Sequence, residues 1–544
     1  MDLKKAYDTV EWGFIREMLV ALNFPNHFVN LMMECVTTLK FSLMVNGVLH
    51  GYFPSKIGLR QGDPISPLLF VLGMEYLFRL LAKVSMMDQF KHHPRCASLK
   101  LNHLCFADDL LLFSSGDVPS IMLLLRAFKR FSETSGLHAN NSKTFVYCSG
   151  MSKGDEKFIL ESSGFAKSSF PFRYLGIPIF SKKISAAECD NIIEKMVARI
   201  RVWSSRNVSY AGWCVLINSV LIAVHSYWAQ LMVLPKYVLE QLNKICRVVL
   251  WKGNHDTNTP GLVAWNQVCL PKYVGGLGFR NIEHWNFGTL GKYVWDIARD
   301  KDSLWVRWIH SVYLKGQYWW SYNASQNCSW YWRKIVEVKN AIKEKMEMEE
   351  FRNMKFNISG LCGKLWPNQS QKVWHAFTWN RYSFPKHKFI TWLACQDKLL
   401  TRDRLIQFGI TTESKCLLCE QATETHQYIF FDCFYSKEIV TSILSWVEMK
   451  MTQRTLEACL KSIKRRKLSK FRREFLVEVM NAVVYCVWEA RNVSLWEQKV
   501  YTVNNIVKKI KYDVCNRFSH FKREKTSKVD RDWYEALSSS YGAL

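Results

Sequence analysis

The sequence lacks the features of a secreted or membrane-spanning protein. No apolar run approaches the ~18–20 residues that a membrane span needs, and the longest candidate, 65–81, is interrupted by Glu75 and Arg79. The first residues contain no apolar segment of the kind found in secretory signals. The 17 cysteines are an odd number scattered along the chain, which argues against a disulfide framework and for a reducing compartment. We therefore expect a nuclear or cytoplasmic protein that has no membrane partner.

Acidic residues are scarce: the chain has 47 Asp and Glu and 74 Lys and Arg, which gives a formal net charge of +27. Such a surplus favours an anionic partner, above all nucleic acid, although a basic solvated surface is the plainer alternative. Internal repeats and long low-complexity tracts are also lacking. Hydrophobic residues make up 49% of the 544 residues and aromatic residues 14%, which excludes a disordered chain. This length suggests about three or four domains.

Local patterns predict a mixture of helices and hairpins. Apolar residues at helical spacing predict helices over 11–24 and 28–39. Asn46-Gly47 lies between two apolar runs and predicts a tight hairpin. Pro67 begins a predicted apolar helix that extends to residue 83. A second predicted hairpin carries Asp108-Asp109 at its tip, with short apolar runs on both sides.

The pair Asp108-Asp109 is the first candidate for chemistry. Two neighbouring carboxylates raise each other's pKa unless a cation is present. Mg²⁺ prefers oxygen ligands, and two such ions can activate an attacking hydroxyl and stabilise a leaving pyrophosphate. An isolated Asp-Asp pair more often forms only a polar turn. Here the flanking apolar strands and the Gly- and Pro-rich stretch 58–67 favour the chemical interpretation.

Three motifs, in the order DLKKAYD (2–8), GLRQGDPISPLLF (58–70) and FADD (106–109), resemble the palm motifs of reverse transcriptases. The relatives that they resemble most are the plant non-LTR (LINE-type) retrotransposon polymerases. SGL (135–137), with Asn140 and Lys143, is similar to the next palm motif. FRYLG (172–176) resembles the primer-grip segment of the family. The resemblance covers residues 1–180 and continues more loosely to LGFR (277–280).

The resemblance implies a role for each matched acid. Asp2 and Asp108 would hold Mg²⁺, with Asp109 supporting them, in an RNA-directed DNA polymerase that uses an RNA template, a DNA primer and deoxynucleotides. Lys143 would donate a proton to pyrophosphate; the alternative is an ordinary lysine on a solvated face.

The resemblance also implies three substrate contacts. Tyr7 would reject a ribose 2′-OH by steric clash, although a lone tyrosine is more often a core aromatic. Gln61 would contact the incoming nucleotide or the template, and Gly62 would allow close approach of the backbone. A metal-dependent nuclease built on the same acids would leave Tyr7 and Gln61 without a role.

Asp2 is the second residue, so the fingers subdomain that precedes this motif in the family is expected to be missing. We expect a retrotransposon open reading frame truncated at its N-terminus. Loss of the fingers puts the activity of this chain in question, and the alternative function is a non-catalytic remnant that binds nucleic acid.

A second cluster combines Cys416, Cys419, His426 and Cys433. Four soft or borderline ligands at this spacing favour a structural, tetrahedral Zn²⁺ site. The alternative is a set of buried apolar cysteines beside the aromatic run 428–431. The segment 370–446 also resembles the zinc-binding domain that follows plant LINE-type polymerases.

These observations predict an α+β protein: a polymerase palm with an antiparallel sheet that carries the acids, a helical thumb-like region and a small zinc-binding module. A dense basic run, 461–473, could contact phosphates, act as a nuclear localisation signal or form a solvated helix face. The predicted regions are a palm over 1–180, a thumb-like or connection region over 181–290, a Trp-rich unassigned region over 291–369, the zinc module over 370–446 and a basic helical tail over 447–544.

Overall fold

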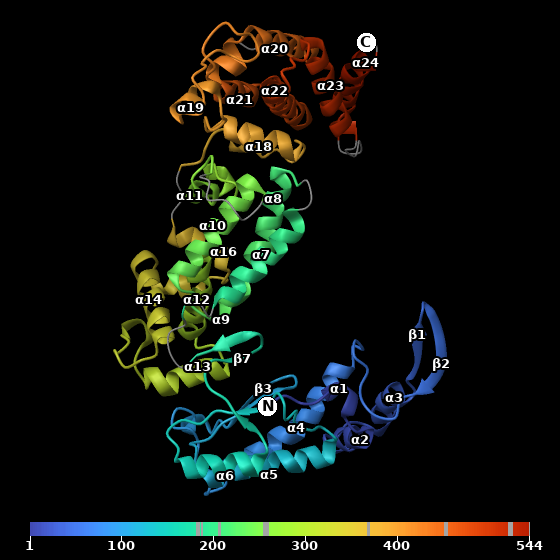
Figure 1. The fold of residues 1–544 in the computed structure, drawn as a ribbon, viewed down its shortest axis with the longest axis vertical. Coiled ribbons are helices and arrows are strands. Elements are labelled where there is room, and N and C mark those ends of the chain that lie inside the picture. Colours follow the sequence, from blue (N-terminus) through green and yellow to red (C-terminus); the bar gives the residue numbers. More distant parts are fainter. Residues whose placement is uncertain are drawn as a thin grey trace. The chain divides into compact units, whose positions relative to one another are not determined.

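Figure 1 shows the computed structural model of the chain, coloured from blue at the N-terminus to red at the C-terminus. It describes residues 1–180, 185, 189–204, 208–253, 261–366, 370–450, 455–519 and 526–542. The chain divides into two compact units, each made of two sequence segments: Met1–Lys183 with Asp296–Ala324, and Ile184–Trp295 with Ser325–Leu544. Residues 181–184 and 367–369, where predicted regions begin or end, lie outside the described residues.

The first unit has a helical core, and its central helix α4 begins beside Pro67, as the sequence predicts. Helix α4 packs against α2 and α5, and the side chains of Leu77, Leu81 and Phe131 are completely buried there. Pro67 lies in the first turn of α4, where its missing N–H costs no hydrogen bond. The helices are α1 (Ala6–Thr9), α2 (Trp12–Ala21), α3 (Asn26–Thr37), α4 (Ser66–Ser85), η1 (Ala97–Leu99), α5 (Val118–Ser135), α6 (Lys153–Ser163), α13 (Leu304–Ile309), η5 (His310–Leu314) and η6 (Trp319–Ser321).

The strands of the first unit form small sheets. Both predicted hairpins are present, and Asn46 and Gly47 adopt the positive φ values that their tight turn requires. Among the described residues every sheet has two strands, so the sheet that carries the acids is smaller than a full antiparallel palm sheet. The pairs are β1 (Lys40–Val45) with β2 (Val48–Pro54), β3 (His103–Phe106) with β4 (Asp109–Leu112), β5 (Phe145–Val146) with β6 (Ala166–Lys167) and β7 (Phe172–Tyr174) with β8 (Ile177–Ile179).

The first part of the second unit is helical, as the sequence predicts. Its tryptophans are largely core residues, since Trp213, Trp228 and Trp332 are buried. The helices are α7 (Asp190–Ser204), α8 (Tyr210–Leu216), η3 (Ile217–Leu221), α9 (Ile222–Leu231), α10 (Lys236–Lys252), α11 (Trp265–Val268), η4 (Lys272–Val274), α12 (Ile282–Ala298), α14 (Trp330–Lys345), α15 (Met348–Asn353) and α16 (Ile358–Leu365).

The continuous helical stretch Tyr210–Leu231 is long and apolar enough to cross a membrane by length and composition alone. This helix corrects the expectation that no segment is long and apolar enough to cross a membrane. Ser219 and His225 interrupt its apolar residues, so the sequence shows no continuous apolar run there. Core helices of soluble proteins pass the same test. In this unit α8 packs against α10 and α18, and His225 is buried.

The second part of this unit is built around the long helix α22, which packs against α18, α20 and α23. Most of the described residues after 447 are helical, as predicted, and they share this packed core with the cysteine-containing segment. The helices are α17 (His375–Thr378), α18 (Pro385–Ala394), α19 (Arg402–Gln407), η7 (Tyr428–Asp432), α20 (Phe434–Trp446), α21 (Leu456–Arg465), α22 (Lys470–Glu497), α23 (Val503–Ser519) and α24 (Lys528–Gly542).

Candidate functional site

The hairpin β3–β4 brings the acids of the two motifs together. Phe106 pairs with Asp109, and the tight turn between them is made by Ala107, with φ +53°, and Asp108. Asp2 forms an antiparallel bridge with Asp109. The backbone of Met1 fixes this bridge: its carbonyl accepts from the Leu110 N–H at 2.9 Å, and its amino group donates to the Leu110 carbonyl at 2.6 Å. Asp2, Asp108 and Asp109, here named the acidic site, therefore lie at one end of one hairpin.

A second segment fixes Asp2 from the other side. The Asn140 N–H donates to the Asp2 carbonyl at 2.8 Å, and the Asn140 side-chain amide donates to the Asp2 carboxylate at 3.2 Å. The Asp2 N–H donates to the Thr144 hydroxyl at 3.3 Å. Lys143 places its Nζ 3.9 Å from Asp2 Oδ2, and its side chain is 69% exposed. The structure thus brings the predicted Lys143 to the acidic site as a loose, solvated ion pair, which contributes little to stability.

The acidic site brings three carboxylates together with two positive groups, the amino terminus and Lys143. Burial raises the pKa of Asp109, and the neighbouring charges of Asp108 and Asp2 raise it further, while the amino terminus and Lys143 act in the opposite direction. Burial, followed by the charge of Asp109, raises the pKa of Tyr174, which places the predicted primer-grip segment near this carboxylate. A divalent cation would relieve the repulsion between the carboxylates, and carboxylate oxygens are ligands that Mg²⁺ prefers. The ligand atoms of the three acids do not all lie within 4.8 Å of one another, so the acids are neighbours and do not form a closed cluster.

Tyr7 and the loop after residue 57 form a second part of this region. The half-buried Tyr7 ring stacks on Phe70 with 5.1 Å between ring centroids, and the Tyr7 carbonyl accepts from the Leu59 N–H at 2.5 Å. Gln61 and Gly62 are exposed on the same loop, and Gly62 has φ +89° with open space around its Cα. The geometry thus fits the predicted close approach of a substrate to Gly62.

Two glycines for which sequence reasoning proposed no role also fix this region. At Gly58, with φ +86°, a Cβ would lie 2.7 Å from the Asp8 carbonyl oxygen. At Gly136, with φ +76°, it would lie 2.7 Å from the Thr9 carbonyl oxygen. Both glycines lie within recognised motifs, but only the fold reveals which backbone each one touches.

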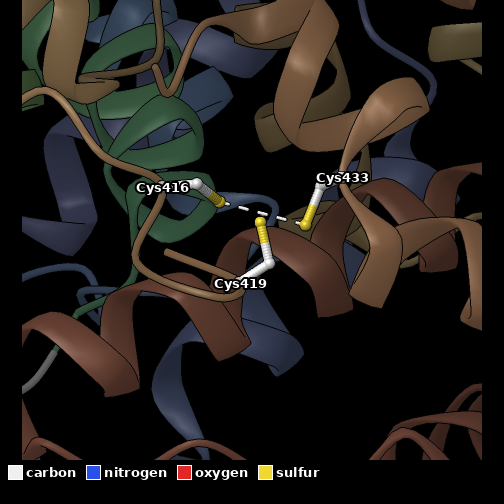
Figure 2. Close-up of side chains that lie close together, drawn as sticks. All are labelled: Cys416, Cys419 and Cys433. Atoms are coloured by element: carbon white, nitrogen blue, oxygen red, sulfur yellow. Dashed lines mark hydrogen bonds between the residues drawn. The ribbon is translucent and has the colours of Figure 1, made fainter. Parts of the chain in front are cut away.

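The second candidate site is a cluster of thiols. The sulfur atoms of Cys416, Cys419 and Cys433 point toward one another and all lie within 4.8 Å of each other (Figure 2). In the described part of the chain, no other set of three or more Cys, His, Asp or Glu side chains is this close. Cys416 and Cys433 are completely buried. These three residues are named the thiol site.

The backbone of the thiol site forms a tight knuckle. The Cys416 N–H donates to the Ala422 carbonyl at 2.7 Å, and the Glu420 N–H donates to the Cys416 carbonyl at 2.8 Å. The Cys416 thiol lies 3.9 Å from the Cys433 sulfur and donates to it, which lowers the pKa of Cys433. Three converging sulfurs are a donor set that fits Zn²⁺.

The structure does not bring His426, the fourth predicted ligand, into the thiol site. Its Nε2 accepts from the Leu399 N–H at 3.0 Å, and its Nδ1 lies 3.4 Å from the Thr401 hydroxyl. Of the three sulfurs, that of Cys419 lies 3.1 Å from the Tyr428 hydroxyl.

A buried ion pair that sequence reasoning missed holds the knuckle against α22. The Glu424 carboxylate accepts from Nε and Nη2 of Arg491 at 3.0 and 2.9 Å, and both side chains are almost fully buried. The same carboxylate accepts from the Leu417 N–H at 3.2 Å and the Arg402 N–H at 3.0 Å. The two partners are 67 residues apart, so no local pattern could have revealed the pair.

The predicted basic run is divided between two helices. Helix α21 buries Leu456, Leu460 and Ile463 and leaves Lys464 and Arg465 exposed. At the start of α22, Arg472 forms an ion pair with Asp530 at 3.0 Å, so it supports the packing of α24. Only part of the run is therefore available to bind phosphates.

Comparison with known families matches the two candidate sites to two domains. The family described as "Reverse transcriptase (RNA-dependent DNA polymerase)" matches residues 1–179, and the family described as "zinc-binding in reverse transcriptase" matches residues 356–439. The first match contains the acidic site and the second contains the thiol site.

The relatives share part of this chain. The Pol polyprotein of the type-2 retrotransposable element R2DM of Drosophila melanogaster is 30% identical over 189 residues, 32% of this chain and 17% of the relative. The Pol polyprotein of the type-1 retrotransposable element R2 of Popillia japonica is 29% identical over 145 residues, 26% and 23% of the two chains. A "Putative ribonuclease H protein" of Arabidopsis thaliana is 29% identical over 141 residues, again 26% and 23%. The matches thus span less than a quarter of each relative.

Proposed function

We propose that this chain is an RNA-directed DNA polymerase of the non-LTR retrotransposon type. The matches to the reverse transcriptase and zinc-binding families and to the Pol polyproteins of two R2 elements support the proposal. Its substrates are an RNA template, a DNA primer and deoxynucleotides. The observation that carries the proposal is the bridge between Asp2 and Asp109, which joins segments more than 100 residues apart and brings Asp2 to the hairpin that carries Asp108. A polar turn without function requires no such convergence.

In this proposal Asp2 and Asp108 hold Mg²⁺ and Asp109 supports them within the palm. Bound Mg²⁺ lowers the pKa of the primer hydroxyl and stabilises the leaving pyrophosphate. Asn140 holds the Asp2 carboxylate in place through its side-chain amide. Lys143 extends into solvent beside Asp2, where it can give a proton to the departing pyrophosphate.

Tyr7 selects the sugar of the incoming nucleotide. Its ring is held by stacking on Phe70 and keeps part of its surface exposed. A fixed ring under the sugar rejects a 2′-OH by clash, which favours deoxynucleotides. Gln61 and Gly62 lie on the adjoining exposed loop, where the backbone can approach the nucleotide or the template closely.

Primer extension on an RNA template tests the proposal. The full chain is assayed with Mg²⁺ beside Asp108→Ala, with Asp88→Ala as the matched control because Asp88 is an exposed acid of the same unit. We expect Asp108→Ala to lower extension at least about a hundredfold, as loss of a transition-state stabiliser does, and Asp88→Ala to leave it unchanged.

A chain that binds primer and template but never extends them would contradict the polymerase proposal. That result would support the second candidate, a non-catalytic protein that binds nucleic acid. The observation that favours this candidate is the exposed basic face of α21 opposite its buried apolar face. Its binding would weaken steeply with salt, because phosphate contacts release counterions.

A further inference from the structure

A cavity of about 530 Å³ in the second unit, here named the basic cavity, shares no lining residue with the acidic site or the thiol site. Three cationic side chains line it, those of Lys272, Arg280 and Lys388. None of the described residues that line it is acidic, and none of the three cations forms an ion pair with another described residue. Unpaired cations around one hollow favour an anionic ligand.

The LGFR motif, which no function above explains, ends at Arg280 and brings it to this cavity. The Gly278 N–H donates to the Leu270 carbonyl at 3.0 Å. At Gly276, just before the motif, a Cβ would lie 1.9 Å from the same carbonyl oxygen, so the backbone can follow this path only with glycine there. The Arg280 guanidinium lies 4.5 Å from the centre of the Trp285 ring, which orients it further.

The two lysines come from the segments on either side of α17. Lys272 begins η4, and its Nζ lies 5.0 Å from the ring centre of Trp379, which also lines the cavity. Burial lowers the pKa of Lys388 on α18, and the charges of Lys272 and Arg517 lower it further. The completely buried Glu478 acts in the opposite direction. An anion in the cavity would relieve the repulsion among these cations.

A second cavity, of about 1010 Å³ and lined mainly by apolar and aromatic residues, adjoins the basic cavity, because Ala211 and Phe389 line both. The Tyr210 ring stacks on Phe389 with 5.1 Å between ring centroids and 11° between the ring planes. Tyr210 is 45% exposed, and Trp496, which also lines this aromatic cavity, is 80% exposed. Cations beside accessible aromatic rings are what proteins use to bind single-stranded nucleic acid, since phosphates meet the cations and bases stack on the rings.

We propose that the two cavities together bind a single-stranded segment of nucleic acid. A backbone phosphate lies among Lys272, Arg280 and Lys388, and the unpaired base beside it stacks on Tyr210. A duplex keeps its bases stacked inside the helix, so it can contact only the cations. The inference rests on the proposed function, because that function gives the chain a nucleic-acid strand to hold away from the acidic site.

Binding of a fluorescein-labelled oligo(dT) strand to the full chain, followed by fluorescence anisotropy, tests the phosphate contact. Lys272→Gln should weaken binding about tenfold, as loss of one hydrogen bond to a charged group does. It should also reduce the salt slope of the logarithm of the affinity by about 0.7, the share of one phosphate contact on a single strand. Lys355→Gln is the matched control, because Lys355 is an exposed lysine of the same unit that lines neither cavity.

Two results would overturn the phosphate contact. One is an affinity and a salt slope for oligo(dT) that Lys272→Gln and Lys355→Gln leave equally unchanged. The other is binding of inorganic phosphate that depends on Lys272 when oligo(dT) binding does not, which would assign the basic cavity to a free anion.

The stacking contact is tested at Tyr210. Tyr210→Leu removes the aromatic face and should weaken oligo(dT) binding about tenfold, within the effect of losing one stacked base. Binding of the duplex of oligo(dT) with oligo(dA) should stay unchanged, and Tyr210→Phe, which keeps the ring, should retain the affinity for the strand. An equal loss for strand and duplex in Tyr210→Leu would overturn the assignment.

Photocrosslinking of a strand that carries 5-iodouracil to the unmodified chain needs no variant. A crosslink at Tyr210 supports the site, and crosslinks only at residues outside the two cavities would contradict it. Primer extension with Asp108→Ala decides the polymerase proposal separately, because Asp108 lines neither cavity.

Discussion

In the acidic site the three carboxylates are only partly buried, whereas in the thiol site Cys416 and Cys433 are completely buried. The acids are held by backbone pairing from three segments, and their mutual repulsion has no fixed counter-charge other than the solvated Lys143 and the amino terminus. The sulfurs are held by one short knuckle that Glu424 and Arg491 fasten to α22. An open site suits a metal that takes part in chemistry, and a closed site suits a metal that stabilises a fold.

The largest effect that would separate the two sites is loss of zinc. Cys416→Ser should release the metal and unfold the region around 356–439, because structural zinc contributes an apparent ~10–16 kcal/mol in zinc-finger peptides. Asp108→Ala should retain one zinc per chain. Elemental analysis and circular dichroism of both variants check this, and equal zinc in both would show that the thiols do not hold it.

Breaking the buried ion pair should have the next largest effect. Arg491→Met leaves the Glu424 carboxylate buried without its partner, which costs about 3–5 kcal/mol. The exposed pair of Arg79 with Glu75, in the other unit, provides the control: Arg79→Met should cost less than ~1 kcal/mol. Urea unfolding followed by tryptophan fluorescence measures both, and a similar cost for the two variants would contradict the proposed fastening of the knuckle.

A substitution at Gly136 should destabilise the unit that contains the acidic site and leave the thiol site intact. Gly136→Ala places a Cβ against the Thr9 carbonyl at a positive φ and should destabilise the first unit by about 1–3 kcal/mol. Gly150→Ala, also at a positive φ but with open space around it, should cost less. Thermal unfolding and zinc content check the prediction. Release of zinc by Gly136→Ala would show that the two sites are not independent.

The smallest effect concerns charge. The raised pKa of Asp109 means that folding favours its protonated form, so its contribution to the free energy of unfolding should fall as pH rises from the ordinary aspartate pKa through the raised one. Asp109→Asn should remove this slope and slightly stabilise the metal-free chain at neutral pH. Thermal melts across the acid range measure it, and a variant less stable than the unmodified chain at every pH would contradict the repulsion.

Local sequence patterns predicted the turns and helix starts that depend on the conformational preferences of neighbouring residues. Asn46-Gly47 required a tight turn, Pro67 marked a helix start, and the apolar runs around Asp108 required a hairpin. Motif order predicted that Asp2 would meet that hairpin. Distant contacts that belong to no motif, such as that of Glu424 with Arg491, could not be predicted from the sequence. The spacing of soft ligands predicted the convergence of three thiols, but it did not reveal that His426 contacts Leu399 and Thr401.

The separate roles of the acidic site in chemistry and of the thiol site in zinc binding can be tested on one preparation of the full chain. The chain is freed of Mg²⁺ by dialysis, its zinc content is measured, and primer extension is assayed before and after Mg²⁺ is restored. We predict that one zinc is retained throughout and that extension appears only with Mg²⁺ and only when Asp108 is intact. Extension supported by the retained zinc alone, or extension unaffected by Asp108→Ala, would contradict the assignment of chemistry to the acidic site.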